Sequence, residues 1–462
     1  MAPLHHLALT VISIILLFSS YANAKSRCEK HLVPKTYPEL DVADGWEAHL
    51  LVNNLDRPRM IVVDDRGQLL ISGSREGIMA LVLDEEGCKV EQTATIVEGG
   101  SDYYNHGLAL SPDGKTLYAS TSSSVYSWSY SSSTLSISSR KRLITGMSSG
   151  GHITRTLLIP PTSPDLLLVS RGSDGNLDSA TRSPSSGRSM IRVFNLTSTT
   201  ETDYTTGGHL LGWGLRNSVG LSSHPTTHSV WSVENSADNL RRMGTDIHID
   251  NPGEELNHHG SPSSWSLSTT TTAAKNFGYP DCFTASDPSS IPGLDTAKIG
   301  AQFALSPNAT FTDNHCQNTT LFTPPRLTFP AHTAPLGIAF HRDLSAAFIA
   351  FHGSWNRPDP VGYELAMVEF DKDSGEPVMQ SDAGNPAKSV LRNMELAKCP
   401  GACFRPTAVA VGGGGEVFVA GDSTGEVWVL RKSSEGGSGG GRVKVGVMGA
   451  MVVVVGMLWN GV

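Results

Sequence analysis

The sequence lacks the patterns that mark several common classes of protein. Its net charge is −9 at pH 7 and it contains no block of basic residues, so a nucleic-acid partner is not expected. Helical periodicity is hard to find between the two ends of the chain, which argues against a helical fold. Its six cysteines include no pair with the CxxC spacing of zinc sites.

The N-terminal end is typical of a secreted protein. An apolar run, Leu9–Phe18, is followed by Ala22-Asn23-Ala24, and small residues at these spacings are what signal peptidase accepts. We therefore expect a signal peptide over residues 1–24 and a mature chain that begins at residue 25.

The C-terminal end resembles a signal for attachment of a GPI anchor. Residues 433–462 combine Ser433-Ser434, a Gly/Ser spacer and an uncharged apolar tail. A tail-anchored transmembrane helix is the alternative, although the tail is near the lower length limit for one. We expect cleavage near Ser434, location at the cell surface, and membrane contact only through the GPI anchor.

The cysteines fit this compartment. An even number in a secreted chain predicts disulfide bonds. Pairing of nearest neighbours would join Cys28 to Cys88, Cys282 to Cys316 and Cys399 to Cys403, but the sequence alone does not fix the pairing. Three glycosylation sequons, at residues 195, 308 and 318, also fit a secreted surface.

Residues 25–432 contain a repeated pattern. A short apolar strand, a polar turn and a second apolar strand occur six times, which is the signature of a β-hairpin. The six copies are Arg59–Ser74, Gly107–Ser120, Thr156–Ser170, Val219–Glu234, Leu336–Phe351 and Ala408–Ala420. Further strand-like runs lie between them. The sequence therefore predicts an all-β protein, a six-bladed β-propeller, with a pair of β-sandwiches as the alternative.

Each hairpin is preceded by a basic residue or a histidine. These residues are Arg57, His106, His152, Arg216, His332 and Arg405. The innermost strands of a propeller run along its axis, so we expect all six side chains to meet at one end of the central channel. Such a ring would suit a small, planar ligand with several negative charges. Any one of these residues alone could instead be a structural ion-pair or hydrogen-bond partner.

Two other features point to the same centre. The stretch HGSWNRPDPVGY, from His352 to Tyr363, follows a predicted strand, where ligand-binding loops are common. Glu234-Asn235-Ser236 and residues 251–257 are acidic and turn-prone, which suits Ca²⁺, but they lack EF-hand spacing. At a channel mouth, His106 would be a general base with a pKa near the working pH.

Taken in order along the chain, five motifs resemble one family. GLRNS, ENSAD, PGEELN, NFGYP and HGSWNRP followed by GY are similar to those of the soluble quinoprotein glucose/sorbosone dehydrogenases. The pattern is most similar to the fungal pyrroloquinoline quinone (PQQ)-dependent pyranose dehydrogenases, and it spans about residues 40 to 430. The resemblance implies a six-bladed propeller, PQQ on its axis, Ca²⁺ beside it, and oxidation of a pyranose at the anomeric carbon.

The resemblance also implies roles for particular residues. His106 would be the catalytic base. The residues implied to bind PQQ are Arg216, Asn217, Arg357 and Arg405, and we add His332 from its place in the predicted ring. The backbone carbonyls of Ser236 and Ala237 would bind Ca²⁺, although bacterial relatives have Gly and Pro at these two positions.

Electrons would pass to an external acceptor, such as a cytochrome or a copper redox protein. Two alternatives remain open at this point. The first is a surface propeller without catalysis that binds carbohydrate or a partner protein, and the second is a metal-dependent lactonase.

Overall fold

The computed structural model describes Cys28 and residues 39–148, 150–265 and 274–433. The predicted signal peptide and the GPI signal beyond Ser433 lie outside the described residues. In the part that is described, no helix is long and apolar enough to cross a membrane.

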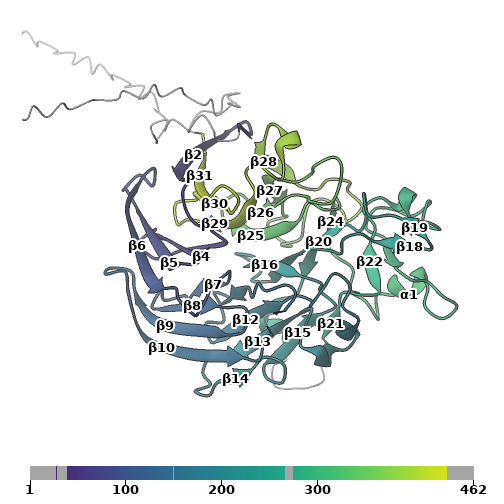
Figure 1. Cartoon of the computed structure of the whole chain (residues 1–462), viewed down its shortest axis with the longest axis horizontal. Coiled ribbons are helices and arrows are strands. Elements are labelled where there is room, and N and C mark those ends of the chain that lie inside the picture. The colour runs from purple at the N-terminus through teal and green to yellow at the C-terminus, as the bar shows by residue number, and fades with distance from the viewer. Residues whose placement is uncertain (1–27, 29–38, 149, 266–273, 434–462) are drawn as a thin grey trace, which may run out of the picture.

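Six sheets of mainly antiparallel strands form a ring (Figure 1), so the predicted six-bladed β-propeller is confirmed. The innermost strand of each blade packs against the innermost strand of the next blade, and the last one packs against the first, which closes the ring. These innermost strands are β3 (Met60–Val63), β7 (Leu108–Leu110), β11 (Leu157–Leu158), β16 (Ser218–Ser223), β25 (Pro335–His341) and β29 (Pro406–Val411).

The other strands follow outward in each blade. The second strands are β4 (Leu69–Ser74), β8 (Thr116–Ser120), β12 (Leu166–Arg171), β17 (Val230–Glu234), β26 (Ala346–Phe351) and β30 (Val417–Gly421). The third are β5 (Gly77–Leu83), β9 (Val125–Ser131), β13 (Met190–Asn195), β20 (Glu254–His258), β27 (Glu364–Glu369) and β31 (Glu426–Lys432). The fourth are β6 (Val90–Glu98), β10 (Ser136–Thr145), β15 (His209–Trp213), β24 (Leu327–Phe329), β28 (Lys388–Asn393) and β2 (Trp46–Val52).

The first strands of the chain complete the last two blades. Strand β2 pairs with β31 and so becomes the outer strand of the sixth blade, and β1 (Leu40–Val42) pairs with β28 in the fifth. Because β2 comes from the beginning of the domain and β31 from its end, their pairing closes the ring. Strands β14 (Thr202–Asp203) and β21 (Lys275–Asn276) extend the second and third blades.

The core is divided among the blade interfaces. Six clusters of buried apolar side chains each contain residues from two neighbouring blades. Second strands such as β26, AAFIAF, are buried along their whole length because other blades cover both of their faces. For this reason their sequences read as continuous apolar runs rather than alternating ones.

Insertions outside the blades lie at the right of Figure 1. They contain the hairpin of β18 (Arg241–Arg242) and β19 (Thr245–Asp246), the pair β22 (Cys282–Thr284) and β23 (Gln302–Ala304), and the one-turn helix α1 (Asp313–Cys316). The three disulfide bonds join Cys28 to Cys88, Cys282 to Cys316 and Cys399 to Cys403. The nearest-neighbour pairing is therefore confirmed.

Candidate active site

Five of the six residues expected to line the axis are buried or partly buried, but the first blade differs from the prediction. His106, Arg216 and His332 are buried, and His152 and Arg405 are partly buried. Arg57 is exposed, so its expected place on the axis was wrong. Arg59, two residues further along and just ahead of β3, contributes the guanidinium of this blade instead.

Arg59 belongs to a group that surrounds Asp422, which follows β30. Its Nη1 lies 2.6 Å from Asp422 Oδ2, and His352 Nε2 lies 2.8 Å from Asp422 Oδ1. Arg405 Nη2 donates to His352 Nδ1 at 2.9 Å and to the carbonyl of Gly353 at 3.2 Å. We call Arg59, His352, Arg405 and Asp422 the Asp422 cluster.

The Asp422 cluster fixes the charge states of its members. Burial would raise the pKa of Asp422, but the hydrogen bond from His352 and the charge of Arg59 outweigh it and lower that pKa. Burial lowers the pKa of His352, and the two arginines act in the same direction. The hydrogen bonds agree, because His352 Nδ1 accepts from Arg405 and so cannot also carry a proton.

A second group surrounds Asp238, which follows β17. Arg216 Nη2 lies 3.2 Å from Asp238 Oδ2, His332 Nδ1 lies 3.6 Å from Oδ1, and Asn356 Nδ2 donates to Oδ1 at 3.4 Å. His332 Nε2 also donates to the carbonyl of His248. We call Arg216, His332, Asn356 and Asp238 the Asp238 cluster.

His332 has the opposite charge preference to His352. Burial alone would lower the pKa of His332, but its hydrogen bonds to Asp238 and to the carbonyl of His248, with the negative charge of Glu254, outweigh it and raise that pKa. Both ring nitrogens face acceptors, which is the arrangement an imidazolium needs.

One loop joins the two clusters. The stretch HGSWNRP, between β26 and β27, contributes His352 to the Asp422 cluster and Asn356 to the Asp238 cluster. In the same loop, Arg357 Nη2 lies 3.5 Å from Asp250 Oδ1. Basic side chains from several blades therefore converge as expected. The sequence did not predict their carboxylate partners, Asp238 and Asp422.

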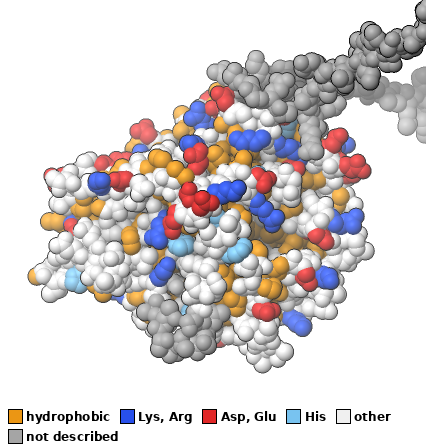
Figure 2. Space-filling view, turned by 180° about the vertical axis from the view of Figure 1, so that it is seen from behind, with side chains coloured by type: hydrophobic (Ala, Val, Ile, Leu, Met, Phe, Trp, Pro, Cys, Tyr) orange, Lys and Arg blue, Asp and Glu red, His pale blue; other side chains and the backbone are white. Residues whose placement is uncertain are grey.

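The spread of charge across the surface agrees with this pairing. Figure 2 shows basic, acidic and histidine side chains intermingled near the middle of one face, rather than a patch of a single sign.

His106 lies beside the Asp422 cluster in a different environment from the one predicted. It is 1% exposed, and burial together with the charge of Arg59 lowers its pKa to about 3. The expected position at an open channel mouth, with a pKa near the working pH, was wrong. The imidazole is therefore neutral at any physiological pH.

The contacts of His106 also fix its tautomer. Nε2 lies 3.1 Å from Thr156 Oγ1 and 3.3 Å from the carbonyl of Val219. The Thr156 hydroxyl donates to that carbonyl, so Nε2 must carry the hydrogen that the two oxygens accept. Nδ1 is left with a free lone pair, and among the described residues it has no hydrogen-bond partner.

Other buried atoms near the axis also lack partners among the described residues, including Asn217 Oδ1, Asn356 Oδ1 and Arg357 Nε. A Cβ built on Gly172 would lie 2.6 Å from Asn217 Oδ1, so only glycine leaves room for that amide. Unpaired donors and acceptors of this kind suit a polar ligand, since burying them without partners is unfavourable.

Arg216 is less available than its position suggests. Besides Asp238, it donates to the carbonyls of Asn176 at 3.2 Å and Asn235 at 3.3 Å and to Asn176 Oδ1 at 3.0 Å. Arg357 and Arg405 have fewer such contacts. The arrangement as a whole fits an anionic, planar group such as PQQ, with Arg357 and Arg405 offering more free donors than Arg216.

The candidate calcium ligands lie in the turn after β17. Ser236 N donates to Glu254 Oε2 at 2.7 Å, and Ala237 is 2% exposed. Residues 251–257 are not simply the turn that was expected, because Glu254–His258 form strand β20. Within the described ranges, no group of three or more His, Cys, Asp or Glu side chains could hold a metal ion. A cation here would therefore depend on backbone carbonyls, which suit Ca²⁺.

Buried carboxyl groups lie beneath this turn. Burial raises the pKa of Glu234 to about 8 and that of Glu254 to about 7. Glu234 accepts from the backbone N of Asn217 and from the hydroxyl of Ser218, so it ties the GLRNS motif to the turn.

Comparison with known proteins identifies the family. A family model described as TrAA12-like matches residues 40–433. A pyrroloquinoline quinone-dependent sugar dehydrogenase of Hypocrea jecorina is 39% identical over 442 residues, which is 94% of this chain and 98% of that protein.

Two solved structures are similar over most of the chain. The calcium structure of the Trichoderma reesei family AA12 protein has a TM-score of 0.81 and 41% identity, covering 88% of this chain and all of that one. The holo form of the pyranose dehydrogenase PQQ domain from Coprinopsis cinerea has a TM-score of 0.79 and 32% identity, covering 85% and 97%. The chain therefore belongs to the TrAA12-like family of PQQ-dependent sugar dehydrogenases, which confirms the resemblance drawn from its motifs.

Proposed function

We propose that this protein is a PQQ- and Ca²⁺-dependent dehydrogenase that oxidises a pyranose at its anomeric carbon to a lactone. The observation that carries the proposal is the pair of clusters around Asp238 and Asp422, with unpaired polar atoms beside them. The names of the relatives support the same cofactor and reaction class.

Four cationic or potentially cationic side chains would hold the cofactor, with Asn217 beside them. When bound, PQQ supplies an ortho-quinone that accepts a hydride, and three carboxylates that need positive partners. Arg357 and Arg405 would donate to carboxylates, and His332 would add a charge, since its pKa is raised. Arg216 would act mainly by fixing Asp238 and the turn at Asn235, with its charge directed at the same pocket.

His106 would take the proton from the anomeric hydroxyl at Nδ1. The lone pair there is free because Nε2–H is held by Thr156 and Val219. Loss of that proton and of the hydride from C1 turns the hemiacetal into a lactone. Because the ring is sealed from solvent, neighbouring side chains must shift when substrate enters. The lowered pKa makes His106 a weak base. An anionic ligand that offsets the charge of Arg59 would raise this pKa and make His106 a stronger base.

The carbonyls of Ser236 and Ala237 would bind Ca²⁺, and a bound cation would in turn favour the ionised forms of the buried carboxyl groups below. Two electrons would then leave to an external acceptor, such as a cytochrome or a copper redox protein. The two predicted terminal signals support secretion and a GPI anchor, and the three disulfide bonds are consistent with an oxidising compartment.

The test is a titration of the purified protein with PQQ in the presence of Ca²⁺, followed by bleaching of a dye acceptor with a panel of pyranoses. We expect tight PQQ binding, dye reduction by at least one sugar, and loss of both on chelation of Ca²⁺. A protein that binds no PQQ, or binds it but reduces no dye with any sugar, would contradict the proposal. Sugar binding without dye reduction would favour the non-catalytic alternative.

A further inference from the structure

Two adjoining hollows lie on the fifth blade. The larger, of about 890 Å³, lies against β27 and β28, and the smaller, of about 480 Å³, lies against the HGSWNRP loop. Both are lined by Pro360 and Leu396, so they meet along these two residues. Their volumes are those of small-molecule sites rather than of a flat protein interface.

The smaller hollow lies beside the loop that contacts the Asp238 cluster. Arg357 lines it, and the neighbouring Asn356 contacts Asp238. Its wall also contains Trp355, whose side chain is 63% exposed. A tryptophan ring left in water beside a polar hollow offers a flat apolar surface with an N–H at its edge, which suits the face of a pyranose ring.

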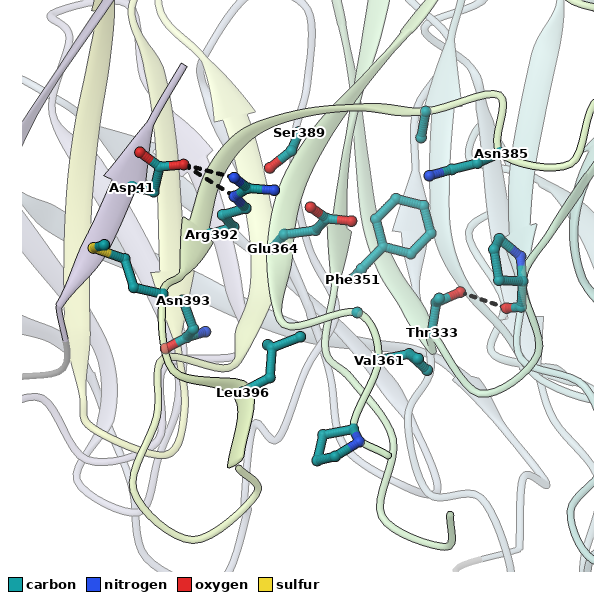
Figure 3. A pocket seen from close by; sticks show the side chains of 15 residues that line it. Asp41, Thr333, Phe351, Val361, Glu364, Asn385, Ser389, Arg392, Asn393 and Leu396 are labelled. Carbon is teal, nitrogen blue, oxygen red and sulfur yellow. Dashed lines mark hydrogen bonds and ion pairs between the residues drawn. The ribbon is translucent and has the colours of Figure 1, made fainter. Parts of the chain in front are cut away.

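The larger hollow is lined by polar groups of mixed type (Figure 3). Glu364 and Ser389 point toward its interior, and Asn385 lies at its edge. Arg392 donates to Asp41 Oδ2 from Nε at 3.0 Å and from Nη2 at 2.9 Å on the far side.

The side chains of this hollow indicate what kind of ligand it suits. Burial raises the pKa of Glu364 above its ordinary value, and its carboxyl oxygens can accept hydrogen bonds from hydroxyl groups. Carboxyl, hydroxyl and amide groups without an excess of either charge match a neutral ligand rich in hydroxyls, and they match neither a lipid nor a polyanion.

We propose that the two hollows form one groove that binds the outer units of a reducing oligosaccharide whose reducing-end pyranose lies at the axial site. This inference rests on the proposed function. Only the reducing end of such a chain has a free anomeric hydroxyl, so that unit must reach His106 and the remaining units must extend away from it. The groove begins beside Arg357 and runs outward past Pro360 to Glu364, which gives those units a path.

The first test compares the rates with monosaccharides and trisaccharides. PQQ-loaded protein is assayed with single sugars and with α- and β-linked reducing trisaccharides built from them. We expect kcat/KM to be at least tenfold higher for the best trisaccharide than for its monosaccharide. Trp355→Ala and Glu364→Gln should each remove most of that preference. Leu321→Ala, which truncates an apolar side chain that is 48% exposed and lines neither hollow, is the matched control and should retain it.

The second test separates the groove from the reaction. A trisaccharide reduced at its end to the alditol cannot be oxidised at the anomeric carbon, and its binding to protein without PQQ is measured by calorimetry. We expect binding that weakens at least tenfold in Trp355→Ala and stays unchanged in Leu321→Ala. Absence of binding by every trisaccharide of the panel, or equal binding by the two variants, would overturn the groove. Binding without any sugar oxidation would overturn the proposed function and leave the groove in place.

Discussion

The two axial clusters are built to the same plan and differ in the state of one histidine. Each has a carboxylate between an arginine and a histidine. His332, beside Asp238, has acceptors on both ring nitrogens and a raised pKa. His352, beside Asp422, has the acceptor Asp422 on one nitrogen and the donor Arg405 on the other, and its pKa is lowered.

The difference shows how several basic side chains can lie close together near the axis. The Asp422 cluster has two guanidiniums, one carboxylate and a neutral histidine, so it has one net positive charge. The Asp238 cluster reaches the same net charge with one guanidinium, one carboxylate and a histidine that favours its protonated form. Each cluster thus avoids the repulsion that an unpaired basic ring would suffer, and both still attract an anion.

The largest effect should come from a residue that is in neither cluster. We expect His106→Ala to lower kcat by about 10²–10⁴-fold, the usual contribution of a general base, with little change in the Kd for PQQ. Because burial and the charge of Arg59 hold the pKa of His106 well below its ordinary value, protonation of this residue should cause no fall in kcat/KM between pH 8 and about 6.5. Stopped-flow reduction and a pH profile check both points. Full turnover by the variant, or an acid limb near pH 6.5 that vanishes in it, would contradict this account.

The next prediction compares arginines that differ in the number of hydrogen bonds they make within the protein. Arg357→Ala and Arg405→Ala should each weaken PQQ binding by about 10–100-fold, since a charge-assisted hydrogen bond contributes about 1.5–3 kcal/mol. Arg216→Ala should weaken binding too, and it should also lower the free energy of unfolding, because its hydrogen bonds join Asn176, Asn235 and Asp238. Fluorescence titration and denaturant unfolding measure the two quantities. Equal losses of unfolding free energy in all three variants would contradict the structural role assigned to Arg216.

Removing either carboxylate should lower stability, and the two losses should differ. Asp422→Asn leaves the guanidinium of Arg59 without its carboxylate partner and removes the negative charge beside His352, and we expect it to lower the free energy of unfolding by about 2–3 kcal/mol. Asp238→Asn should cost less, because its contacts with Arg216 and His332 are longer, at 3.2 and 3.6 Å against 2.6 and 2.8 Å.

Chemical denaturation measures these losses. Asp382→Asn, which breaks an ion pair with Lys298 at the surface, is the control and should leave the free energy of unfolding almost unchanged. A larger loss for Asp238→Asn than for Asp422→Asn would reverse the comparison.

The fold could be predicted because each hairpin is a local pattern. A continuous apolar run such as AAFIAF, followed by polar turns, recurs in every blade, and six copies leave few architectures open. The pairing of β2 with β31 has no such signal, since it joins residues that are far apart in sequence.

The site was only partly predictable for the same reason. His332 and Arg405 precede hairpins and could be found by their register. Asp238 and Asp422 are turn residues after strands, where aspartate is common for local reasons, so nothing in the sequence distinguishes them. Arg59 was overlooked in favour of Arg57, because the direction of a side chain at the start of a short strand depends on the backbone turn before it. Arg57 has a φ of 46°, which redirects the chain there.

The smallest effect, and the most direct comparison of the clusters, is in the pH dependence of stability. A histidine whose pKa is raised by folding stabilises the protein fully below its unfolded pKa of about 6.5, and this contribution is lost as pH rises through the folded pKa. A histidine whose pKa is lowered does the opposite, because folding must release its proton, so stability falls as pH drops below about 6.5. His332→Gln should therefore flatten a decline in stability on the alkaline side, and His352→Gln should flatten a decline on the acid side. Urea unfolding of the two variants and the parent between pH 5 and 8 gives two difference curves, and slopes of the same sign would show that the histidines are in the same state.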